Sequence, residues 1–384
     1  MKTAMSLFSG IGGLDEGLHR AGFKLLFCSE LDEHAHTTLK HWCKARRIAP
    51  VFARDINEVK PQQLFRELGL KKSDLDILAG GPPCQSFSLI GSRKSLDDHR
   101  GLLLYKMVEF AKVFKPKAVL IEQVKGLFSA KGLDGKPGTV LKELIVQLET
   151  LGYSVNYRLL RAADYGVPQL RDRVFIVALQ GDSKFIFPEV THYDPGRSDS
   201  QKELFDRRLP YLTLKDVIWD LPLPVLKGQI PMMPNHIDIT PSRDRERIAG
   251  VPEGECLARQ MHLSQDLRQG LDPEKDTTKF RRLSWDKPSL TLRGGEAFYH
   301  PTENRYLTPR EYLRIHGFSD NYTLSGPIRG RSGSVRDLDQ HRLVANAVPP
   351  PLATAIAKAI YQQLFLANGS TKRSENNNRR KLSP

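Results

Sequence analysis

The stretch TAMSLFSGIGG, residues 3–13, joins a short apolar run to a loop rich in glycine. The run has the length and composition of a buried strand, and glycines let another molecule approach the backbone closely. A helical pattern follows in LDEGLHRAGF, and KLLFCSE then has the pattern of a second strand, which ends at Glu30. A strand, a glycine turn, a helix and another strand predict the beginning of a parallel sheet.

The same alternation continues as far as residue 181. The helical patterns DEHAHTTLKHWCKA, LLLYKMVEFAKVF and TVLKELIVQLETLGY are interleaved with the strand-like runs LDILA, AVLIEQV and RVFIVAL. This order predicts a Rossmann-like α/β fold, in which a mostly parallel sheet carries helices on both faces. In such sheets ligands bind at the carboxyl ends of the strands.

Three further segments follow from the change in composition after residue 181. Prolines cluster between residues 188 and 241 and the alternation fades, which predicts a second, smaller, irregular domain over residues 182–333. The helical run PPLATAIAKAIYQQLFLA lies in residues 334–366, which we expect to rejoin and complete the first domain, residues 1–181. The polar, basic segment 367–384 predicts a disordered tail.

Charge and cysteine content limit the class of protein. Lys and Arg number 58 against 44 Asp and Glu, a net charge of +14, which is typical of proteins that bind nucleic acid. The charge is +8 over residues 1–181 (27 − 19), −3 over residues 182–280 (14 − 17) and +9 over residues 281–384 (17 − 8). Four scattered cysteines form no C-x-x-C pair, so we expect a reducing compartment, the cytoplasm, and no metal site. No apolar run approaches the roughly 18 residues that a membrane span needs.

Two carboxylates accompany the glycine loop FSGIGG. Glu30 ends the second strand, about where such folds hold a ribose diol, and Asp55 ends a possible third strand. The loop lacks the full G-x-G-x-x-G spacing, and the chain has no G-x-x-x-x-G-K-[ST], which disfavours dinucleotides and ATP. The interpretation we favour is a cofactor of the adenosine type. The alternative is a tight turn with two solvated or helix-capping acids.

Cys84 and Glu122 are candidates for chemistry. Cys84 lies in GGPPCQSFS, residues 80–88, where prolines fix the backbone and glycines leave it open, a suitable mount for a reactive thiol or an ordinary loop. Glu122 ends the apolar strand AVLIEQV, where burial would raise the pKa of its carboxyl group toward neutrality, as a proton donor requires. The alternative for Glu122 is a structural ion pair.

The block QLRDR places Gln169, Arg171 and Arg173 two residues apart, and therefore on one face of an extended segment. Two arginines on one face suit an anion or a base oxygen, or else form an exposed basic edge.

Six blocks together resemble the DNA cytosine-5 methyltransferases of bacterial restriction–modification systems. FSGIGG resembles their S-adenosylmethionine loop, GGPPCQSFS their nucleophile motif, IEQV their Glu-Asn-Val motif and QLRDR their Gln-x-Arg-x-Arg motif. NRYLTPREYLRIHGFSDNY and ANAVPPPLA resemble their last two blocks, in family order. The chain departs from the family at Gln123, where asparagine is usual, and at Ala345, where glycine is usual.

The resemblance implies a role for each matched residue. The Cys84 thiolate would add to carbon 6 of a flipped cytosine, Glu122 would bind ring nitrogen 3, and Arg173 would hold the exocyclic oxygen. Arg171 would support Glu122, and the backbone of Pro82 would meet the exocyclic amine. The S-adenosylmethionine site would comprise Phe8, Gly10, Gly12, Glu30, Asp55, Ile56, Pro82, Asn346 and Val348.

The resemblance also implies double-stranded DNA as the partner. The loop from Ser86 to Arg100 would close over the DNA, and the DNA contacts would include Gln85, Ser88, Arg100 and Gln169. The family recognises its target between the QLRDR block and the next one. Within TLRGGEAFYH we expect Arg293 to read a base, with Arg281 and Arg282 as the next candidates; the alternative for all three is phosphate contact.

Rival interpretations keep part of this pattern. One branch of the family methylates tRNA, but the proline-rich middle section of roughly 100 residues favours the DNA branch. A non-catalytic nucleic-acid-binding relative would not need Cys84 and Glu122, and a nicotinamide-dependent oxidoreductase would need the missing fingerprint. We expect a monomer in the bacterial cytoplasm, associated with the nucleoid and with no membrane contact. By family habit, a separate restriction endonuclease would recognise the same DNA.

Overall fold

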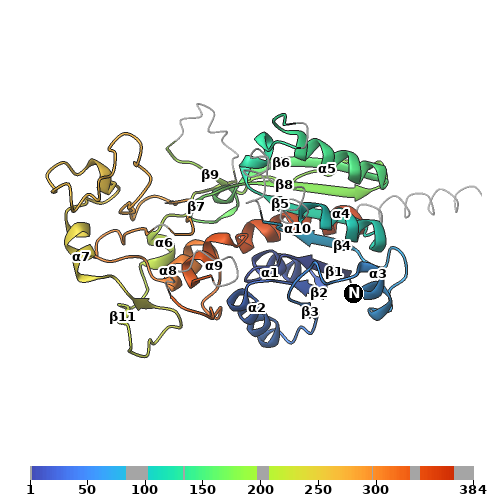
Figure 1. Ribbon diagram of the computed structural model, residues 1–384, viewed down its shortest axis with the longest axis horizontal. Coiled ribbons are helices and arrows are strands. Elements are labelled where there is room, and N and C mark those ends of the chain that lie inside the picture. Colours follow the sequence, from blue (N-terminus) through green and yellow to red (C-terminus); the bar gives the residue numbers. More distant parts are fainter. Residues whose placement is uncertain are drawn as a thin grey trace, which may run out of the picture.

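A seven-stranded sheet forms the centre of the larger part of the molecule (Figure 1). The computed structural model describes residues 2–83, 103–132, 135–196, 207–295, 297–328 and 338–366. Cys84, Gln85, Ser88, Arg100, the predicted closing loop and the predicted tail lie outside these ranges. The strand order is β3-β2-β1-β4-β5-β8-β6. The strands are β1 (Lys2–Leu7), β2 (Phe23–Ser29), β3 (Val51–Ala53), β4 (Ile77–Gly80), β5 (Ala118–Gln123), β6 (Tyr153–Arg161) and β8 (Asp172–Gln180).

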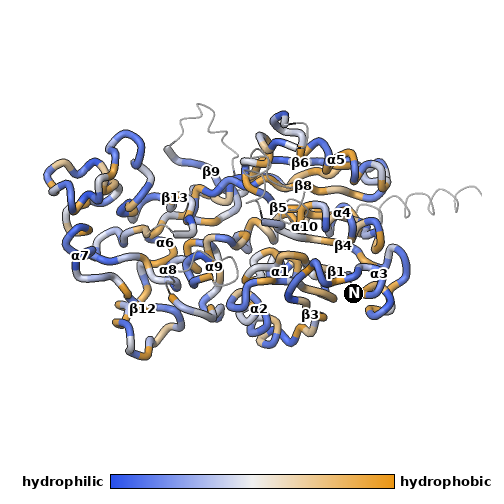
Figure 2. Tube along the Cα trace, in the orientation of Figure 1, coloured by the Kyte–Doolittle hydropathy of each residue, from blue (hydrophilic) through white to orange (hydrophobic). Residues whose placement is uncertain are grey.

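Period-two alternation in the strands builds two apolar layers, one on each face of the sheet. In β4, Ile77 and Ala79 pack into one core cluster, and Leu78 packs into the other. The first cluster includes residues of α1 (Gly13–Arg20), α2 (Glu33–Ala45) and α10 (Pro350–Phe365). The second includes residues of α3 (Pro61–Glu67), α4 (Leu103–Phe114) and α5 (Thr139–Thr150). Figure 2 shows hydrophobic residues concentrated along these strands and helices.

The predicted α/β fold is confirmed, with two differences in detail. Strands β3, β2, β1, β4 and β5 run parallel, but β8 pairs antiparallel with both β5 and β6. The apolar run in β8 predicts a strand, whereas β6 and α3 were not predicted from the sequence. Five of the nine β6 residues are only partly buried and two are exposed, so the strand carries no clear hydrophobic run.

Helix α10 returns to the sheet and packs closely against α1. A Cβ atom on Gly13 would lie 2.0 Å from the carbonyl oxygen of Val348, and one on Gly17 would lie 2.4 Å from Cβ of Ala353. Glycine at both positions lets the two segments meet backbone to backbone. Within the described ranges, Gln340–Phe365 is long and apolar enough to cross a membrane, yet 72 % of its apolar window is buried inside the protein.

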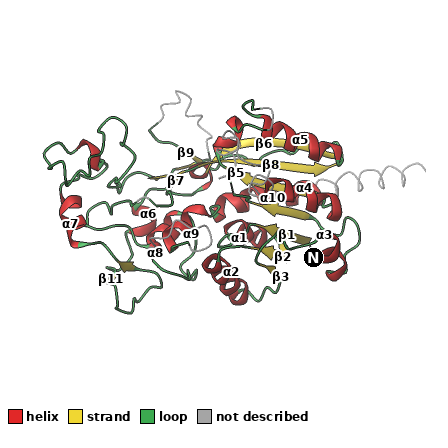
Figure 3. Ribbon diagram, in the orientation of Figure 1, coloured by secondary structure: helices red, strands yellow, loops and turns green. Residues whose placement is uncertain are grey.

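The residues between β8 and α9 (Gln340–Asn346) are mostly loops (Figure 3). Their helices are short: α6 (Lys215–Ile218), α7 (Ser242–Ala249) and α8 (Pro309–Ile315). Two-residue strands occur as the pairs β9 (His192–Tyr193) with β10 (Leu209–Pro210), β11 (Val225–Leu226) with β12 (Ile237–Asp238), and β7 (Gln169–Leu170) with β13 (Ser289–Leu290). The last pair joins this region to the sheet-forming part of the chain.

Candidate active site

The carboxyl ends of β1, β2, β4 and β5 bring the predicted site residues to one edge of the sheet. Strand β1 lies between β2 and β4 and runs parallel to both, which makes this edge the topological switch point where ligands bind in open α/β sheets. The glycine loop follows β1, Glu30 follows β2, the prolines follow β4, and Glu122 is the next-to-last residue of β5.

The glycine loop is held by its neighbour across the sheet edge. Oε2 of Glu30 accepts a hydrogen bond of 2.7 Å from the backbone N–H of Gly10, and Oε1 accepts one of 2.8 Å from that of Asp32. Phe8, Gly10 and Gly12 have φ angles of +58°, +57° and +90°. Such left-handed conformations are unusual for a bulky residue such as Phe8 and mark a constrained turn.

The loop leaves room for a ligand above Gly10. A Cβ atom there would meet no atom within 4 Å, whereas one on Gly12 would lie 2.8 Å from Leu39. Burial raises the pKa of Glu30 to about 7, although the backbone N–H groups of Asp32 and Gly10 oppose the shift. An open backbone beside a titratable carboxylate fits the adenosine and ribose of the predicted cofactor.

The remaining cofactor candidates occupy three different places. Asp55 follows the end of β3, whose Ala53 accepts a hydrogen bond from the Glu30 backbone, and Ile56 is buried in the core. Asn346 is exposed at the end of α9. Val348 is buried, and its carbonyl lies over Gly13 at the start of α1. The structure therefore brings Val348 to the glycine loop, and the end of β3, two residues before Asp55, to the backbone of Glu30.

The end of β5 packs against the proline loop that precedes Cys84. Gln123, which is 2 % exposed, donates a hydrogen bond from Nε2 to the carbonyl of Pro82, and its Oε1 is buried with no protein partner. A Cβ atom on Gly81 would lie 3.2 Å from Oε2 of Glu122, so the loop and the carboxylate are close neighbours. The longer side chain at the family's asparagine position thus reaches the proline backbone directly.

Arg173, and not Arg171, forms the ion pair with Glu122. Nε of Arg173 lies 2.9 Å from Oε1 of Glu122, so Arg173 pairs with the carboxylate that Arg171 was expected to support. Arg171 is 1 % exposed and donates instead to the carbonyls of Leu292, Ala345 and Ala347. The last carbonyls of a helix lack intrahelical partners, and Arg171 supplies donors at the end of α9.

Three of the predicted DNA contacts are committed to protein atoms. Gln169 is fully buried and bonds Leu292 and His316. Arg282 is 5 % exposed and donates to Ile248, Pro301 and Asn304. Arg281 is half-buried and donates to the carbonyls of Thr277 and Gly254. Buried backbone carbonyls and amides need donors and acceptors of this kind, so these side chains have partners within the protein, and their contact with DNA stays a prediction.

Arg293 differs from these residues because it is exposed, between buried Leu292 and exposed Gly294. His316 is the main site residue that the sequence analysis missed. It lies in the quoted block LRIHGF, but a lone histidine after a helix carries no signal of its role.

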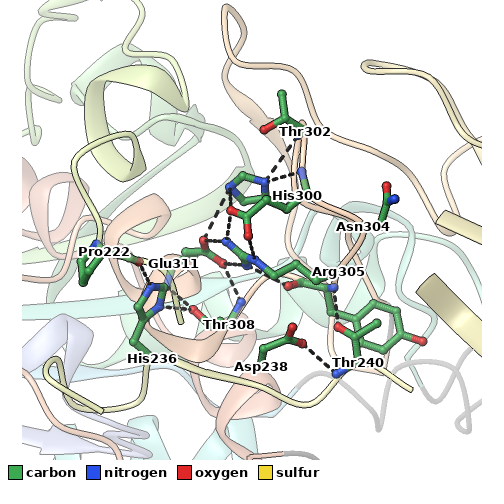
Figure 4. A network of polar contacts seen from close by, with 12 residues as sticks. Pro222, His236, Asp238, Thr240, His300, Thr302, Asn304, Arg305, Thr308 and Glu311 are labelled. Carbon is green, nitrogen blue, oxygen red and sulfur yellow. Dashed lines mark hydrogen bonds and ion pairs between the residues drawn. The ribbon is translucent and has the colours of Figure 1, made fainter. Parts of the chain in front are cut away.

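Residues of the block NRYLTPREYLRIHGFSDNY take part in a buried polar network that holds the middle section of the chain together (Figure 4). Arg305 and Glu311 form a two-pronged ion pair with both hydrogen bonds at 2.8 Å. Burial opposes ionisation of Glu311, but Arg305 outweighs it and lowers the pKa of Glu311 to about 2. Thr308 and Glu311 form a capping box at the start of α8, and His236 links Thr308 to the carbonyl of Pro222. The charged side chains of Arg305 and Glu311 therefore stabilise the fold of this block.

Comparison with known proteins identifies one family model and several similar methyltransferases. The family model described as C-5 cytosine-specific DNA methylase matches residues 2–362. The chain is 30 % identical to the type II methyltransferase M.AgeI of Thalassovita gelatinovora, over 94 % of this chain and 99 % of that protein. It is 33 % identical to the type II methyltransferase M.FnuDI of Fusobacterium nucleatum, over 94 % of each chain.

Solved structures show the same fold. A protein described as a DNA modification methyltransferase encoded within an E. coli prophage superposes with a TM-score of 0.67 at 22 % identity, covering 95 % of this chain and 99 % of that one. The DNMT2 protein of Spodoptera frugiperda superposes with a TM-score of 0.59 at 17 % identity, covering 94 % of this chain and 100 % of that one.

Proposed function

The chain belongs to the C-5 cytosine-specific DNA methylase family, and from this premise we propose that it methylates cytosine through a covalent adduct with Cys84. The substrates are S-adenosylmethionine and a cytosine flipped out of double-stranded DNA within a specific sequence. The observation that carries the proposal is the convergence, at one sheet edge, of the open glycine loop, the proline loop that precedes Cys84 and the Glu122–Arg173 pair.

The target carbon needs activation before it can accept a methyl group. Carbon 5 of cytosine is a weak nucleophile, and a thiolate that bonds to carbon 6 converts the ring to an enamine whose electron pair lies at carbon 5. S-adenosylmethionine supplies an electrophilic methyl group. A base then removes the proton from carbon 5, and the sulfur–carbon bond breaks with return of its electrons to Cys84. Water is our candidate for that base.

Glu122 and Arg173 assist the addition by binding the ring. The Glu122 carboxyl group, in its protonated form, donates a hydrogen bond to ring nitrogen 3, which lets the ring accept electron density from the thiolate. Arg173 binds the exocyclic oxygen while it orients the carboxylate 2.9 Å away. The Pro82 carbonyl, which Gln123 already contacts, accepts from the exocyclic amine. The contacts at ring nitrogen 3 and at the exocyclic amine distinguish cytosine from thymine and uracil, which carry an N–H and an oxygen at these positions.

The cofactor site uses the open face of the glycine loop. The Glu30 carboxylate binds the ribose hydroxyls, and Phe8, Asp55, Ile56, Asn346 and Val348 complete the site. Extrusion of the target base costs a few kcal/mol of lost stacking and pairing. DNA phosphates are held by the basic flanking sections, and Arg293 reads a base edge or a phosphate. The enzyme acts as a monomer in the bacterial cytoplasm, alongside a separate restriction endonuclease.

The proposal is tested by bisulfite conversion sequencing of genomic DNA from a bacterial host without methylation of its own. One culture expresses the protein, a second Cys84→Ser, and a third Cys256→Ser, which removes a buried thiol from the middle section. We expect modified cytosines in one sequence context with the wild-type protein and with Cys256→Ser, and none with Cys84→Ser. Unmodified DNA alongside soluble wild-type protein would contradict the proposal, and methylated RNA in the same cells would favour the RNA alternative.

A further inference from the structure

A chain of buried hydrogen bonds joins the exposed loop at Arg293 to the turn between α9 and α10. The backbone N–H of Leu292 donates to Oε1 of Gln169 at 3.2 Å, and Nε2 of Gln169 lies 3.0 Å from Nδ1 of His316. Nε2 of His316 in turn lies 2.9 Å from the carbonyl oxygen of Ala347. Gln169 and His316 are both fully buried, so no solvent interrupts the chain.

The direction of every hydrogen bond in this chain is determined. A backbone N–H can only donate, so Oε1 of Gln169 accepts from Leu292 and its Nε2 donates to Nδ1 of His316. The other ring nitrogen of His316 then carries the proton and donates to Ala347. Burial, with repulsion from Arg171, holds the pKa of His316 well below its usual value, so the ring stays neutral and keeps this tautomer.

Arg171 forms a second link in parallel with the first. Its Nη1 lies 3.4 Å from the carbonyl of Leu292, and its Nη2 lies 2.7 Å and 3.1 Å from the carbonyls of Ala345 and Ala347. Both backbone polar groups of Leu292 therefore bind side chains that lead to Ala347. The hydroxyl of Thr291, one residue earlier, donates to the carbonyl of Leu170 and holds the segment that contains Leu292.

The two ends of this chain of hydrogen bonds lie next to two different segments, the exposed loop at Arg293 and the turn that carries Asn346 and Val348. Leu292 directly precedes Arg293, Gly294 and Gly295, which are exposed. Ala347 lies between Asn346 and Val348, and the Val348 carbonyl contacts the start of the glycine loop helix at Gly13. A shift of the turn at Ala347 cannot leave Leu292 in place without breaking buried hydrogen bonds, each of which leaves an unsatisfied polar group.

We propose that Gln169, Arg171 and His316 form a relay that couples occupancy of the cofactor site to the position of the Arg293 loop. His316 is a positioning residue in this relay and touches neither substrate. The inference rests on the proposed cofactor site. Coupling between two sites is reciprocal, so DNA that orders the Arg293 loop strengthens cofactor binding by the same factor by which the cofactor strengthens DNA binding.

The test measures that factor directly. Calorimetry gives the affinity for S-adenosylhomocysteine with and without a DNA duplex that carries the sequence found by conversion sequencing. For the wild-type protein we expect DNA to raise the affinity by about fivefold or more, the usual lower range of allosteric coupling. We expect His316→Leu to reduce the factor to near one, and His316→Gln, whose amide also accepts and donates, to retain most of it.

His236→Leu is a matched control. His236 is also a buried histidine that uses both ring nitrogens, toward Thr308 and Pro222, but it contacts neither end of the relay (Figure 4). We expect it to lower stability and leave the coupling factor unchanged. Should His316→Leu fail to fold, Gln169→Met interrupts the same chain at its preceding member.

Two kinds of failure are distinguishable. A wild-type protein that binds S-adenosylhomocysteine with equal affinity in the presence and absence of DNA would overturn the relay alone. So would retention of the wild-type factor in folded His316→Leu, or its loss in His236→Leu. A wild-type protein that does not bind S-adenosylhomocysteine would overturn the proposed cofactor site and the relay with it.

Discussion

Nε of Arg173 and Oε1 of Glu122 lie 2.9 Å apart on the adjacent antiparallel strands β8 and β5. Both side chains are mostly buried, with 14 % and 12 % of their surface exposed. A guanidinium has several donors in one plane, so Nη1 of Arg173 donates to the Asp172 carbonyl and Nη2 can serve a further acceptor while Nε orients the carboxylate. One residue thus connects the carboxylate to the place where the base oxygen would lie.

We expect Arg173→Lys to be almost as damaging as Arg173→Ala, because an ammonium cannot orient Glu122 and bind a second oxygen in one plane. A loss of kcat of about 100-fold or more is the usual effect of removing a preorganised donor to developing charge. Transfer of a radioactive methyl group to DNA measures kcat, and unchanged calorimetric affinity for S-adenosylhomocysteine shows that the fold is intact. A lysine variant with near wild-type kcat would contradict the planar arrangement.

Gln123 should be sensitive to the exchange of its amide for a carboxylate. Gln123→Glu would face the Pro82 carbonyl with an acceptor and leave a buried polar pair unsatisfied, at a cost of about 1–3 kcal/mol. We expect kcat to fall by roughly tenfold or more. Gln123→Asn keeps the amide found at this position in the family and is the matched comparison; a Gln123→Glu variant that retains wild-type kcat would show that the contact with Pro82 is not what matters.

Binding of the cofactor should depend on pH through Glu30. Its pKa of about 7 means that the carboxylate is ionised above neutral pH and protonated below it. The ionised form accepts stronger hydrogen bonds from ribose hydroxyls, by about 1 kcal/mol, so affinity for S-adenosylhomocysteine should fall roughly fivefold as the pH drops from 8 to 6.

Glu30→Gln separates this effect from other titrating groups. Asp15, buried beneath the glycine loop, has a pKa raised to about 6 by burial and remains present in the variant. We expect Glu30→Gln to bind more weakly at pH 8 and to lose the pH dependence. A variant with the wild-type pH profile would assign the dependence to another group, such as Asp15.

The Arg305–Glu311 pair should contribute to stability with a defined pH window. The folded pKa of Glu311, about 2, lies below the ordinary glutamate value of 4.5, so its contribution is present above about pH 4.5 and is lost as the pH falls toward 2. Arg305→Met should lower the free energy of unfolding by about 3–5 kcal/mol at pH 7, because it leaves a buried carboxylate unpaired. Urea unfolding at pH 7 and pH 3 measures both effects, and an equal loss at the two pH values would contradict the assignment.

Gly13 should not tolerate a methyl group. Its Cβ atom would lie 2.0 Å from the Val348 carbonyl, so Gly13→Ala must move the start of α10 away from α1, at a cost of about 1–3 kcal/mol. We expect a lower midpoint of thermal unfolding and weaker S-adenosylhomocysteine binding. Gly126→Ala is the control, because its Cβ atom would meet its nearest neighbour, Val124, at an ordinary 3.7 Å.

The sequence allowed prediction of the parts of the fold and site in which local pattern and position agree. Strands β1, β2, β4 and β5 are apolar runs that end in a special residue, so both the strands and the convergence of their ends were predictable. The strand β6 was not, because its exposed residues carry no hydrophobic run.

The side-chain partners of buried polar groups could not be predicted in the same way. Arginine and glutamine usually lie at the surface, so the burial of Arg282 and Gln169 was not expected. Only the fold shows which backbone groups need their hydrogen bonds. His316 meets Gln169 across 147 residues of chain, and no pattern of spacing within either segment encodes that contact.

The close contact between Gly13 and Val348 also has a consequence for synthesis of the protein on the ribosome. The two residues are separated by more than 330 positions, so the strands of the sheet are synthesised well before the segment that packs against Gly13. Nascent chains therefore emerge without a finished site. A transcript broken before the closing helix yields no active enzyme, and modification of the genome begins only when translation has passed the α10 segment.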